Sequence, residues 1–118
     1  MFTISKEFHF SAAHRLLTLA EDHPCYRLHG HNYIVTIELK SEQVSDNGFV
    51  VDFRDLTPLK NYIDGTFDHQ YLNDVFGDVP TTSELLAKHF YDWSKQKWSE
   101  VSAVRVSETA KTWAEYRP

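Results

Sequence analysis

The sequence has few of the residues that cross-link, anchor or export a chain. Its single cysteine, Cys25, excludes a disulfide framework within the chain and predicts a reducing, cytoplasmic location. The longest apolar runs are too short for a transmembrane helix, and Lys6, Glu7 and His9 interrupt the N-terminal segment that a signal peptide would keep apolar. Acidic residues outnumber basic ones by 17 to 12, and the net charge of −5 disfavours a general nucleic-acid binder. We therefore expect neither a membrane nor a nucleic acid as partner.

The chain does contain enough apolar residues to build a core. Hydrophobic residues make up 42% of it and charged residues 25%, proportions that argue against disorder. No repeat, low-complexity tract or linker divides the chain, so we expect residues 1–118 to form a single domain. Seven histidines are many for 118 residues, and they are the first indication of chemistry.

Alternating polar and apolar residues predict two strands, at 2–10 and at 29–40. The alternation is lost over 12–28, where we expect a loop with a short helical turn. Apolar segments at 101–106 and 112–116 predict two further strands, which are close enough in sequence to form a hairpin.

Two helices are expected between the second and third strands. Thr57 followed by Pro58 is typical of an N-cap with proline in the first helical position. A second helix opens at Thr81 or Thr82, with Glu84 at capping-box spacing from the first of them. The economical arrangement is an α+β fold, a four-stranded antiparallel sheet with both helices on one face. Its open edges and open face would be closed by assembly with further copies of the chain.

Three histidines have the spacing of a metal site. His29 and His31 lie two apart on a strand, so their rings share a face, with Cβ atoms roughly 7 Å apart. His14 reaches them if the first two strands pair. Three neutral histidines with no fourth protein ligand describe a catalytic Zn²⁺ site with an open position. The alternative is that these are packed core side chains. A cupin would need a carboxylate where Val35 and Thr36 stand.

Four other residues are candidates for chemistry. Cys25 lies in a loop beside Arg27, a setting that favours the thiolate, which can act as base or nucleophile. Asp68 can hold His69 in one tautomer for proton transfer. Glu108 falls on the apolar side of its strand, where a carboxylate needs a partner. Each has a plain structural alternative: an apolar filler, a capped turn and a strand end turned to solvent.

Taken in order, the motifs A-A-H-R, C-x3-H-G-H, V-D-F, D-H-x-Y-L-N, T-S-E and S-E-T resemble the 6-pyruvoyl-tetrahydropterin synthase family over residues 8–116. The Cys-x3-His-Gly-His spacing looks most like the bacterial branch, the 6-carboxy-5,6,7,8-tetrahydropterin synthases of the queuosine pathway. The resemblance implies the tunnelling fold, in which three sheets close a barrel and two trimers stack into a hexamer. Active sites would lie between subunits.

The resemblance also implies the metal and the base. By this likeness His14, His29 and His31 match the family's zinc ligands, and Cys25 matches its catalytic base. The substrate would be 7,8-dihydroneopterin triphosphate, and the products would be 6-carboxy-5,6,7,8-tetrahydropterin, acetaldehyde and triphosphate. The pyruvoyl-forming branch, which eliminates triphosphate without cleaving the carbon chain, is the alternative.

Further roles follow from the same resemblance. Asp68 and His69 match the family's proton relay, and Glu108 matches the carboxylate that anchors the pterin. Thr82 and Ser83 fall where the family places hydroxyls that line the pocket. The bacterial branch often reads Asn-Pro-Thr before Ser-Glu, whereas this chain reads Pro-Thr-Thr, so the helix start is open to a shift.

Two readings from other classes stay open on the residues alone. One is a cysteine-histidine hydrolase with Cys25 as nucleophile, and the other is a structural module that packs into a ring. No glycine-rich phosphate loop is present, and the basic candidates for the triphosphate are Arg15, Arg27, Lys60 and Lys111.

Overall fold

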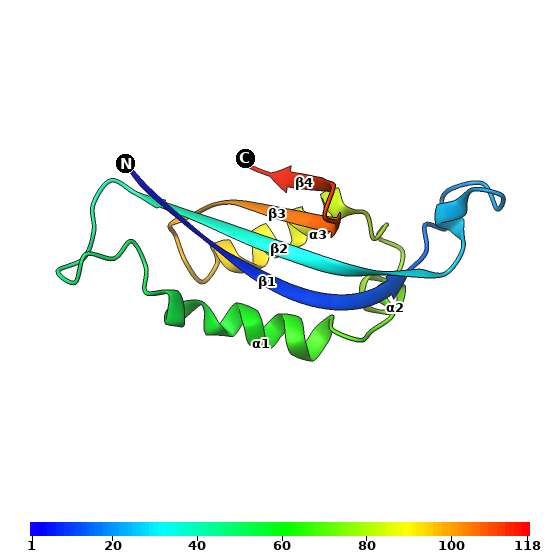
Figure 1. The fold of residues 1–118 in the computed structure, drawn as a ribbon, viewed down its shortest axis with the longest axis horizontal. Helices are drawn as coiled ribbons and strands as arrows, with labels where there is room; N and C mark the ends of the chain where they lie inside the picture. The colour runs from blue at the N-terminus through cyan, green and yellow to red at the C-terminus, as the bar shows by residue number, and fades with distance from the viewer.

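A single antiparallel sheet organises the computed structural model, which describes residues 1–118 (Figure 1). The sheet has four antiparallel strands, as the sequence predicts, and they lie in the order β1-β2-β3-β4. The elements are β1 (Phe2–His14), η1 (Pro24–Tyr26), β2 (His29–Ser41), η2 (Phe53–Leu56), α1 (Thr57–Thr66), α2 (Leu72–Phe76), α3 (Ser83–Lys95), β3 (Val101–Thr109) and β4 (Thr112–Tyr116), where η denotes a short 3₁₀ helix.

Strand β1 is longer than the predicted 2–10. It pairs with β2 as far as His14, which lies opposite His29, and Ala12 lies opposite His31. The prediction ended β1 early because two adjacent alanines, poor strand formers, interrupt the amphipathic pattern. The ladder with β2 supplies the backbone hydrogen bonds that keep this segment extended. The pairing therefore carries His14 to the end of the sheet where β2 begins.

One face of the sheet holds the core. Fully burying a large apolar side chain contributes roughly 1.5–3 kcal/mol, which makes this face the main source of stability. The buried apolar side chains on this face of the sheet are Phe8, Phe10, Ala12, Tyr33, Val35, Ile37, Leu39, Val101, Val104 and Val106, and helices α1 and α3 add Leu59, Ile63, Leu86, Ala87, Phe90 and Tyr91. Phe2, which shares their parity in the sequence, is 51% exposed and stands outside the core.

The first long helix begins one residue earlier than a Thr57 cap would require. Asp52 instead caps η2 by accepting a hydrogen bond from the backbone nitrogen of Arg54, and η2 leads directly into α1. Thr57 is the first residue of α1, and its hydroxyl donates to the carbonyl of Arg54. Pro58 lies in the first turn, where its missing N–H has no intrahelical partner to lose.

The second long helix, α3, begins at the later of its two predicted positions. Thr82 is the N-cap and accepts a hydrogen bond from the backbone nitrogen of Leu85, so a capping box between Thr81 and Glu84 does not form. The structure also contains a third helix that the sequence did not predict, the five-residue α2, which buries Leu72. Five residues are too few to show helical periodicity.

The opposite face of the sheet is polar and carries no helix. Glu38 on β2 pairs with Arg117 through two hydrogen bonds of 2.7 and 3.0 Å, and Arg117 also contacts Glu115. The Arg117 guanidinium, with the Ser102 hydroxyl, lowers the pKa of Glu38 to about 2. Charged side chains in such a network stay stable in contact with water, so this face needs no apolar cover.

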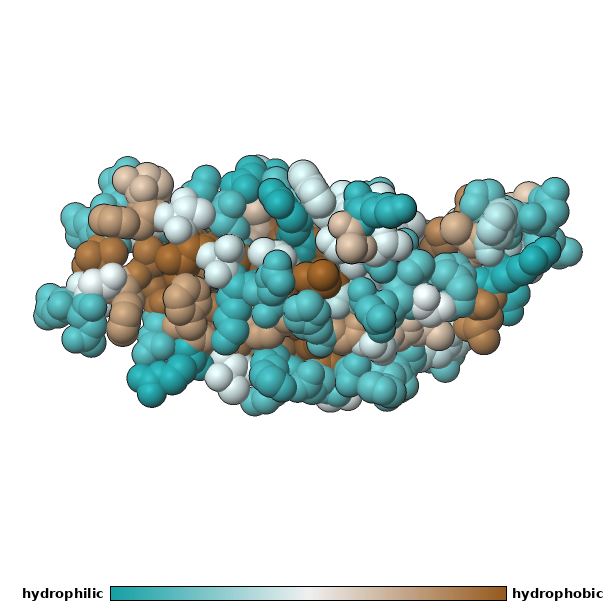
Figure 2. Space-filling view, viewed as in Figure 1, coloured by the Kyte–Doolittle hydropathy of each residue, from teal (hydrophilic) through white to brown (hydrophobic).

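The molecule is elongated, 56 × 25 × 24 Å, and its two ends differ. The loop 15–28 projects beyond the strands at the right of Figure 1, and the loop 42–52 lies at the left. Figure 2 shows hydrophobic side chains gathered at the left end, where Val44, Phe49 and Phe53 are exposed. None of the helices has the length and apolar character needed to cross a bilayer.

Candidate metal centre and active site

Strand pairing brings three histidines together at the right-hand end of the sheet. His14 ends β1, His29 begins β2 opposite it, and His31 follows on the same face. The ring centroids lie 4.6 to 5.1 Å apart, and one nitrogen from each ring lies within 4.8 Å of the others. These three side chains form a group that could hold a metal ion.

Hydrogen bonds at the outer ring nitrogens orient two of the three rings. Nδ1 of His14 lies 3.0 Å from both the carbonyl and the hydroxyl oxygen of Thr81, and Nδ1 of His29 lies 2.6 Å from the carbonyl of Arg27. A carbonyl only accepts, so each Nδ1 carries the proton and each Nε2 presents a lone pair. Metal-binding histidines are held in this way by carbonyl groups behind them.

The Nε2 atoms of the cluster have the surroundings expected of metal ligands. Nε2 of His14 and Nε2 of His31 are buried and have no hydrogen-bond partner. A buried polar atom without a partner costs about 1–3 kcal/mol, unless an ion satisfies it. Burial lowers the pKa of both rings, an effect partly offset by Glu108, so both favour the neutral form that binds metals. Three neutral imidazoles suit a divalent ion with an open position.

Glu108 lies beside the three histidines. One carboxylate oxygen is 3.6 Å from Nε2 of His31, and the other is 4.0 Å from Nε2 of His14. The sequence placed this carboxylate on the apolar side of β3, where it needs a partner, and the structure brings it beside these two nitrogens without a hydrogen bond to either. Its negative charge faces the position where a cation or a ligand's N–H donors would bind.

Tyr33 is a site residue that the sequence analysis missed. It is fully buried, its hydroxyl has no partner, and its ring packs edge-on against His31 at 5.4 Å and His14 at 6.0 Å. Burial, with the nearby charge of Glu108, raises the pKa of the phenol, which therefore stays protonated. Its position two residues after His31 on one strand was the available signal.

Asp68 and His69 lie along the free edge of β1. One oxygen of Asp68 accepts a hydrogen bond of 2.9 Å from the backbone nitrogen of Ser11, and the other lies 2.9 Å from Nδ1 of His69. Two contacts lower the pKa of Asp68: the hydrogen bond from the Ser11 amide, which has the larger effect, and the contact with His69. His69 has a φ of 60°, the only positive value outside glycine, and its ring is 82% exposed. The strained backbone turns this ring outward, free to meet a ligand.

An open hollow connects this pair to the histidine cluster. Its volume is about 530 Å³, and His31 and His69 both line it. The other lining residues are Ser11, Ala12, Ala13, Gly30, Asn32, Gln70 and Tyr71. A ligand in the hollow would contact the edge of the metal group and the Asp68-supported imidazole together.

Cys25 lies in the neighbouring loop, within η1, and is partly exposed. The backbone nitrogen of Leu16 donates to the Cys25 carbonyl, and Nε of Arg15 donates to the carbonyl of Tyr26, at 2.8 and 3.1 Å. These bonds fold the loop back on itself and fix η1 beyond the strand ends. The thiol does not belong to the group of close metal-binding atoms.

Comparison with known proteins places this site in a family. A family model described as 6-pyruvoyl tetrahydropterin synthase matches residues 3–118. The chain belongs to this family. It is 34% identical to the 6-carboxy-5,6,7,8-tetrahydropterin synthase of Bacillus subtilis, covering 99% of this chain and 86% of the relative. Identity to the Synechocystis protein of the same name is 36%, over 98% and 93% of the two chains.

The family's fold is confirmed by solved structures. The 6-pyruvoyl tetrahydropterin synthase of Caenorhabditis elegans superposes with a TM-score of 0.87 at 28% identity, covering 99% of this chain and 95% of that one. The Plasmodium falciparum 6-pyruvoyl tetrahydropterin synthase shares the fold with a TM-score of 0.71. The similarity to this family therefore extends beyond the short motifs, over nearly the whole chain.

The hydroxyl-bearing residues around the start of α3 differ in whether they contact the histidine cluster. Thr82 uses its hydroxyl as the N-cap, and Ser83 is the first helical residue, with both side chains partly exposed. Thr81 instead is 1% exposed and is the residue that touches His14. Nothing in the sequence pattern distinguishes Thr81 from Thr82, because the contact depends on how the α2–α3 connection crosses the end of β1.

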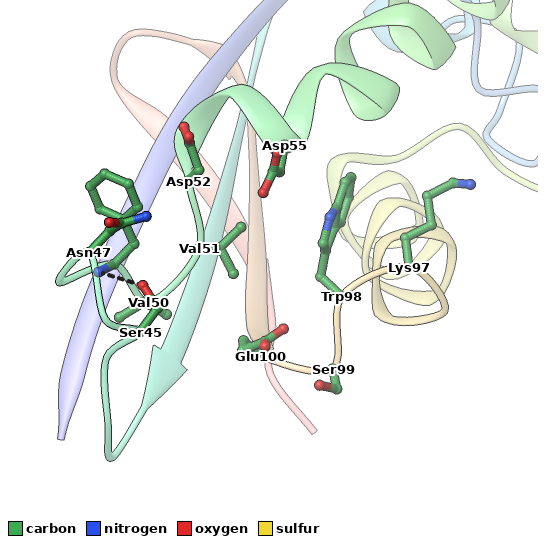
Figure 3. Close-up of a pocket in the computed structure, with 11 residues that line it drawn as sticks. Ser45, Asn47, Val50, Val51, Asp52, Asp55, Lys97, Trp98, Ser99 and Glu100 are labelled. Carbon is green, nitrogen blue, oxygen red and sulfur yellow. Dashed lines mark hydrogen bonds between the residues drawn. The ribbon is translucent and has the colours of Figure 1, made fainter.

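A second hollow, of about 710 Å³, lies at the opposite end of the molecule. Figure 3 shows Asp52, which caps η2, and Asp55, within η2, on one side of it, with Trp98 and Glu100 from the α3–β3 connection on the other. No residue that the sequence analysis singled out for chemistry lines this hollow. The candidate active site is therefore the smaller hollow beside the histidines.

Proposed function

We propose that this chain is a zinc-dependent 6-carboxy-5,6,7,8-tetrahydropterin synthase that acts in the cytoplasm, in queuosine biosynthesis. It converts 7,8-dihydroneopterin triphosphate to 6-carboxy-5,6,7,8-tetrahydropterin, acetaldehyde and triphosphate. The observation that carries the proposal is the pair of buried, unpartnered Nε2 atoms beside a hollow that His69 also lines. The names of the B. subtilis and Synechocystis relatives support the reaction.

The three histidines hold the metal. The Nε2 atoms of His14, His29 and His31 would be its ligands, and three protein ligands are typical of catalytic zinc sites. When bound, zinc supplies a Lewis acid that makes the hydroxyl groups of the substrate side chain more acidic. Zinc is favoured over other ions because an all-imidazole, three-ligand set is typical of its catalytic sites.

Proton transfers fall to Cys25 and His69. Cys25 would act as the base that removes a proton from a carbon of the substrate side chain. His69, with Nδ1 held by Asp68, exchanges a proton through its exposed Nε2. The ionised state of Asp68 is supported by its lowered pKa, so the carboxylate stabilises the imidazolium that forms during the transfer.

Glu108 orients the pterin. Its carboxylate accepts two hydrogen bonds from the amino-pyrimidine edge, a charge-assisted pair that fixes the ring relative to the histidines. The carboxylate of Glu108 lies within 4.0 Å of two imidazoles, so a pterin that it holds would lie next to the histidine cluster. The hydroxyls of Thr82 and Ser83 line the same pocket.

The subunit, one domain over residues 1–118, assembles into trimers that close a barrel and stack as hexamers. Strands β1 and β4 are the sheet edges, and pairing them between copies satisfies their free backbone groups. The polar face around Glu38 and Arg117 would then line a hydrated interior. The loop that carries Cys25 projects from its own subunit (Figure 1), which supports a site completed between subunits.

The pyruvoyl-forming activity is the second candidate, favoured by the likeness to the C. elegans 6-pyruvoyl tetrahydropterin synthase. The three-residue gap between Cys25 and His29 supports the carboxy branch instead. The deciding experiment incubates the purified protein with 7,8-dihydroneopterin triphosphate, as isolated, after chelation and after zinc is restored. We expect acetaldehyde that disappears on chelation and returns with zinc. Triphosphate without acetaldehyde would identify the pyruvoyl activity, and turnover unchanged by chelation would contradict a metal enzyme.

A further inference from the structure

Thr81 makes the contact that fixes the orientation of His14. We propose that Thr81 is a positioning residue, whose carbonyl and hydroxyl together hold the His14 ring in the tautomer that presents Nε2 to the metal. This inference rests on the proposed zinc function, and it extends that function to a residue one position before the hydroxyls of Thr82 and Ser83.

The contact between Thr81 and His14 is shielded from solvent. Both residues are 1% exposed, and Nδ1 of His14 lies 3.0 Å from each of the two Thr81 oxygens. Water has no access to replace either oxygen as acceptor. His29, by comparison, has a single carbonyl of Arg27 behind it, in an exposed loop. Thr81 is therefore the only residue whose side chain supports a ligand histidine from its Nδ1 side.

Both partners are anchored independently of each other. On the β1 side, the Asn73 side chain accepts from the Arg15 amide and donates to the Arg15 carbonyl, and the amide of Ala13 donates to the carbonyl of Gln70. On the other side, Thr82 caps α3, which fixes the peptide that carries Thr81. The contact thus connects the end of the sheet to the start of a helix. A side chain held from both directions positions a ligand with little freedom.

The hydroxyl has a role that the carbonyl alone does not fill. The single N–H at Nδ1 is shared between two acceptors, and a valine would leave only the carbonyl and place a methyl group against the ring nitrogen. The carbonyl, which only accepts, still requires the proton on Nδ1, but the ring loses one of the two contacts that fix its orientation. Partners behind a metal ligand typically change metal affinity by about 10- to 100-fold when removed.

The test compares Thr81→Val with Thr81→Ser in the full chain. We expect Thr81→Val to bind Zn²⁺ about tenfold more weakly, at the low end of the range for such partners, and Thr81→Ser to stay within about twofold of the parent. In the metal-free parent, ¹⁵N spectra of labelled histidine should show His14 protonated at Nδ1, and Thr81→Val should keep this tautomer while it binds Zn²⁺ more weakly. Thr36→Val, a threonine-to-valine change in β2 away from the cluster, controls for general effects on stability.

The two readouts separate this inference from the function on which it rests. If the parent chain binds no zinc, the proposed function fails, while the tautomer of His14 in the metal-free protein still tests Thr81. If Thr81→Val does not fold, the parent spectrum decides, and a His14 protonated at Nε2 overturns the proposal. Parent-like zinc affinity in folded Thr81→Val would also overturn it.

Discussion

A carboxylate oxygen of Asp68 lies 2.9 Å from the backbone nitrogen of Ser11 and accepts its hydrogen bond. The backbone nitrogen of His69 in turn donates to the carbonyl of Ser11. Asp68 thus holds the loop against the edge of β1 with one oxygen while the other contacts the His69 ring. The position of the exposed imidazole relative to the histidine cluster depends on this one carboxylate.

Replacing Asp68 by Asn should reduce turnover by at least about 100-fold, the low end of what positioned proton transfer contributes. An amide still accepts from Ser11 but no longer stabilises a protonated His69. Bound zinc should stay at the parental level, because none of its ligands is touched. Steady-state kinetics and metal analysis measure the two quantities, and a variant with parental turnover would exclude the relay.

Replacing His31 by Ala should abolish stoichiometric zinc binding, since two histidines alone leave too few ligands for a stable site. His9→Ala provides the matched control, because His9 is an exposed histidine on β1 that pairs only with Glu7. Elemental analysis after dialysis compares the two variants. Full occupancy in His31→Ala would show that the ligand set is wrong.

Replacing Cys25 by Ala should remove activity and leave zinc content unchanged, because the thiol lies outside the group of close metal-binding atoms. Cys25→Ser tests whether a weaker acid supports residual turnover. Loss of zinc together with activity would mean that the cysteine is a ligand. A covalent acyl adduct on the parent thiol would favour a hydrolase.

Replacing Glu108 by Gln should raise KM for the pterin more than it lowers kcat, because a neutral amide loses the charge-assisted pair of hydrogen bonds. A loss of about 1.5–3 kcal/mol in binding corresponds to the usual value of a hydrogen bond to a charged group. Equilibrium binding of a pterin analogue provides the direct measurement. Unaltered affinity would remove the anchoring role.

The stability of the chain should fall as pH drops below about 6.5, the ordinary pKa of histidine, and His89 should contribute to this loss. Burial lowers the pKa of His89, whose Nε2 lies 2.7 Å from the Tyr62 hydroxyl oxygen, within hydrogen-bond distance. The unfolded chain therefore takes up a proton at a pH where the folded chain does not, which favours unfolding. In the metal-free protein, His89→Gln should reduce the slope of unfolding free energy against pH between about pH 7 and 5.5, and exposed His9→Gln should not.

The parts of the fold that the sequence predicts are those with a long regular pattern. Alternation over Tyr33 to Leu39 identified β2 and its buried face, and the Thr-Pro pair located the start of α1 to within one residue. The end of β1 was not predicted, because hydrogen bonding to β2, rather than local conformational preference, keeps Ala12 and Ala13 extended. Helix α2 escaped because it is shorter than two helical turns.

In the site, too, local spacing was predictable and long-range contacts were not. The spacing of His29 and His31 follows from strand geometry, so the sequence alone indicated that the two rings share a face. The contact of Thr81 with His14 and the bond from Ser11 to Asp68 join residues more than 50 positions apart. Such contacts depend on how the connections cross the sheet edge, and no local pattern records that path.

The register that places His14 opposite His29 gives the metal centre a defined tolerance to changes in chain length. The loop 15–28 leaves the sheet after His14 and returns to it at His29, two residues paired across the strands. Insertions within this loop should therefore leave the three histidines undisturbed. Deleting one residue between Phe8 and His14 would instead slip the ladder and turn His14 to the far side of the sheet. Changes in chain length should therefore be tolerated in the part of this loop that precedes Cys25, and not in the strands beside it.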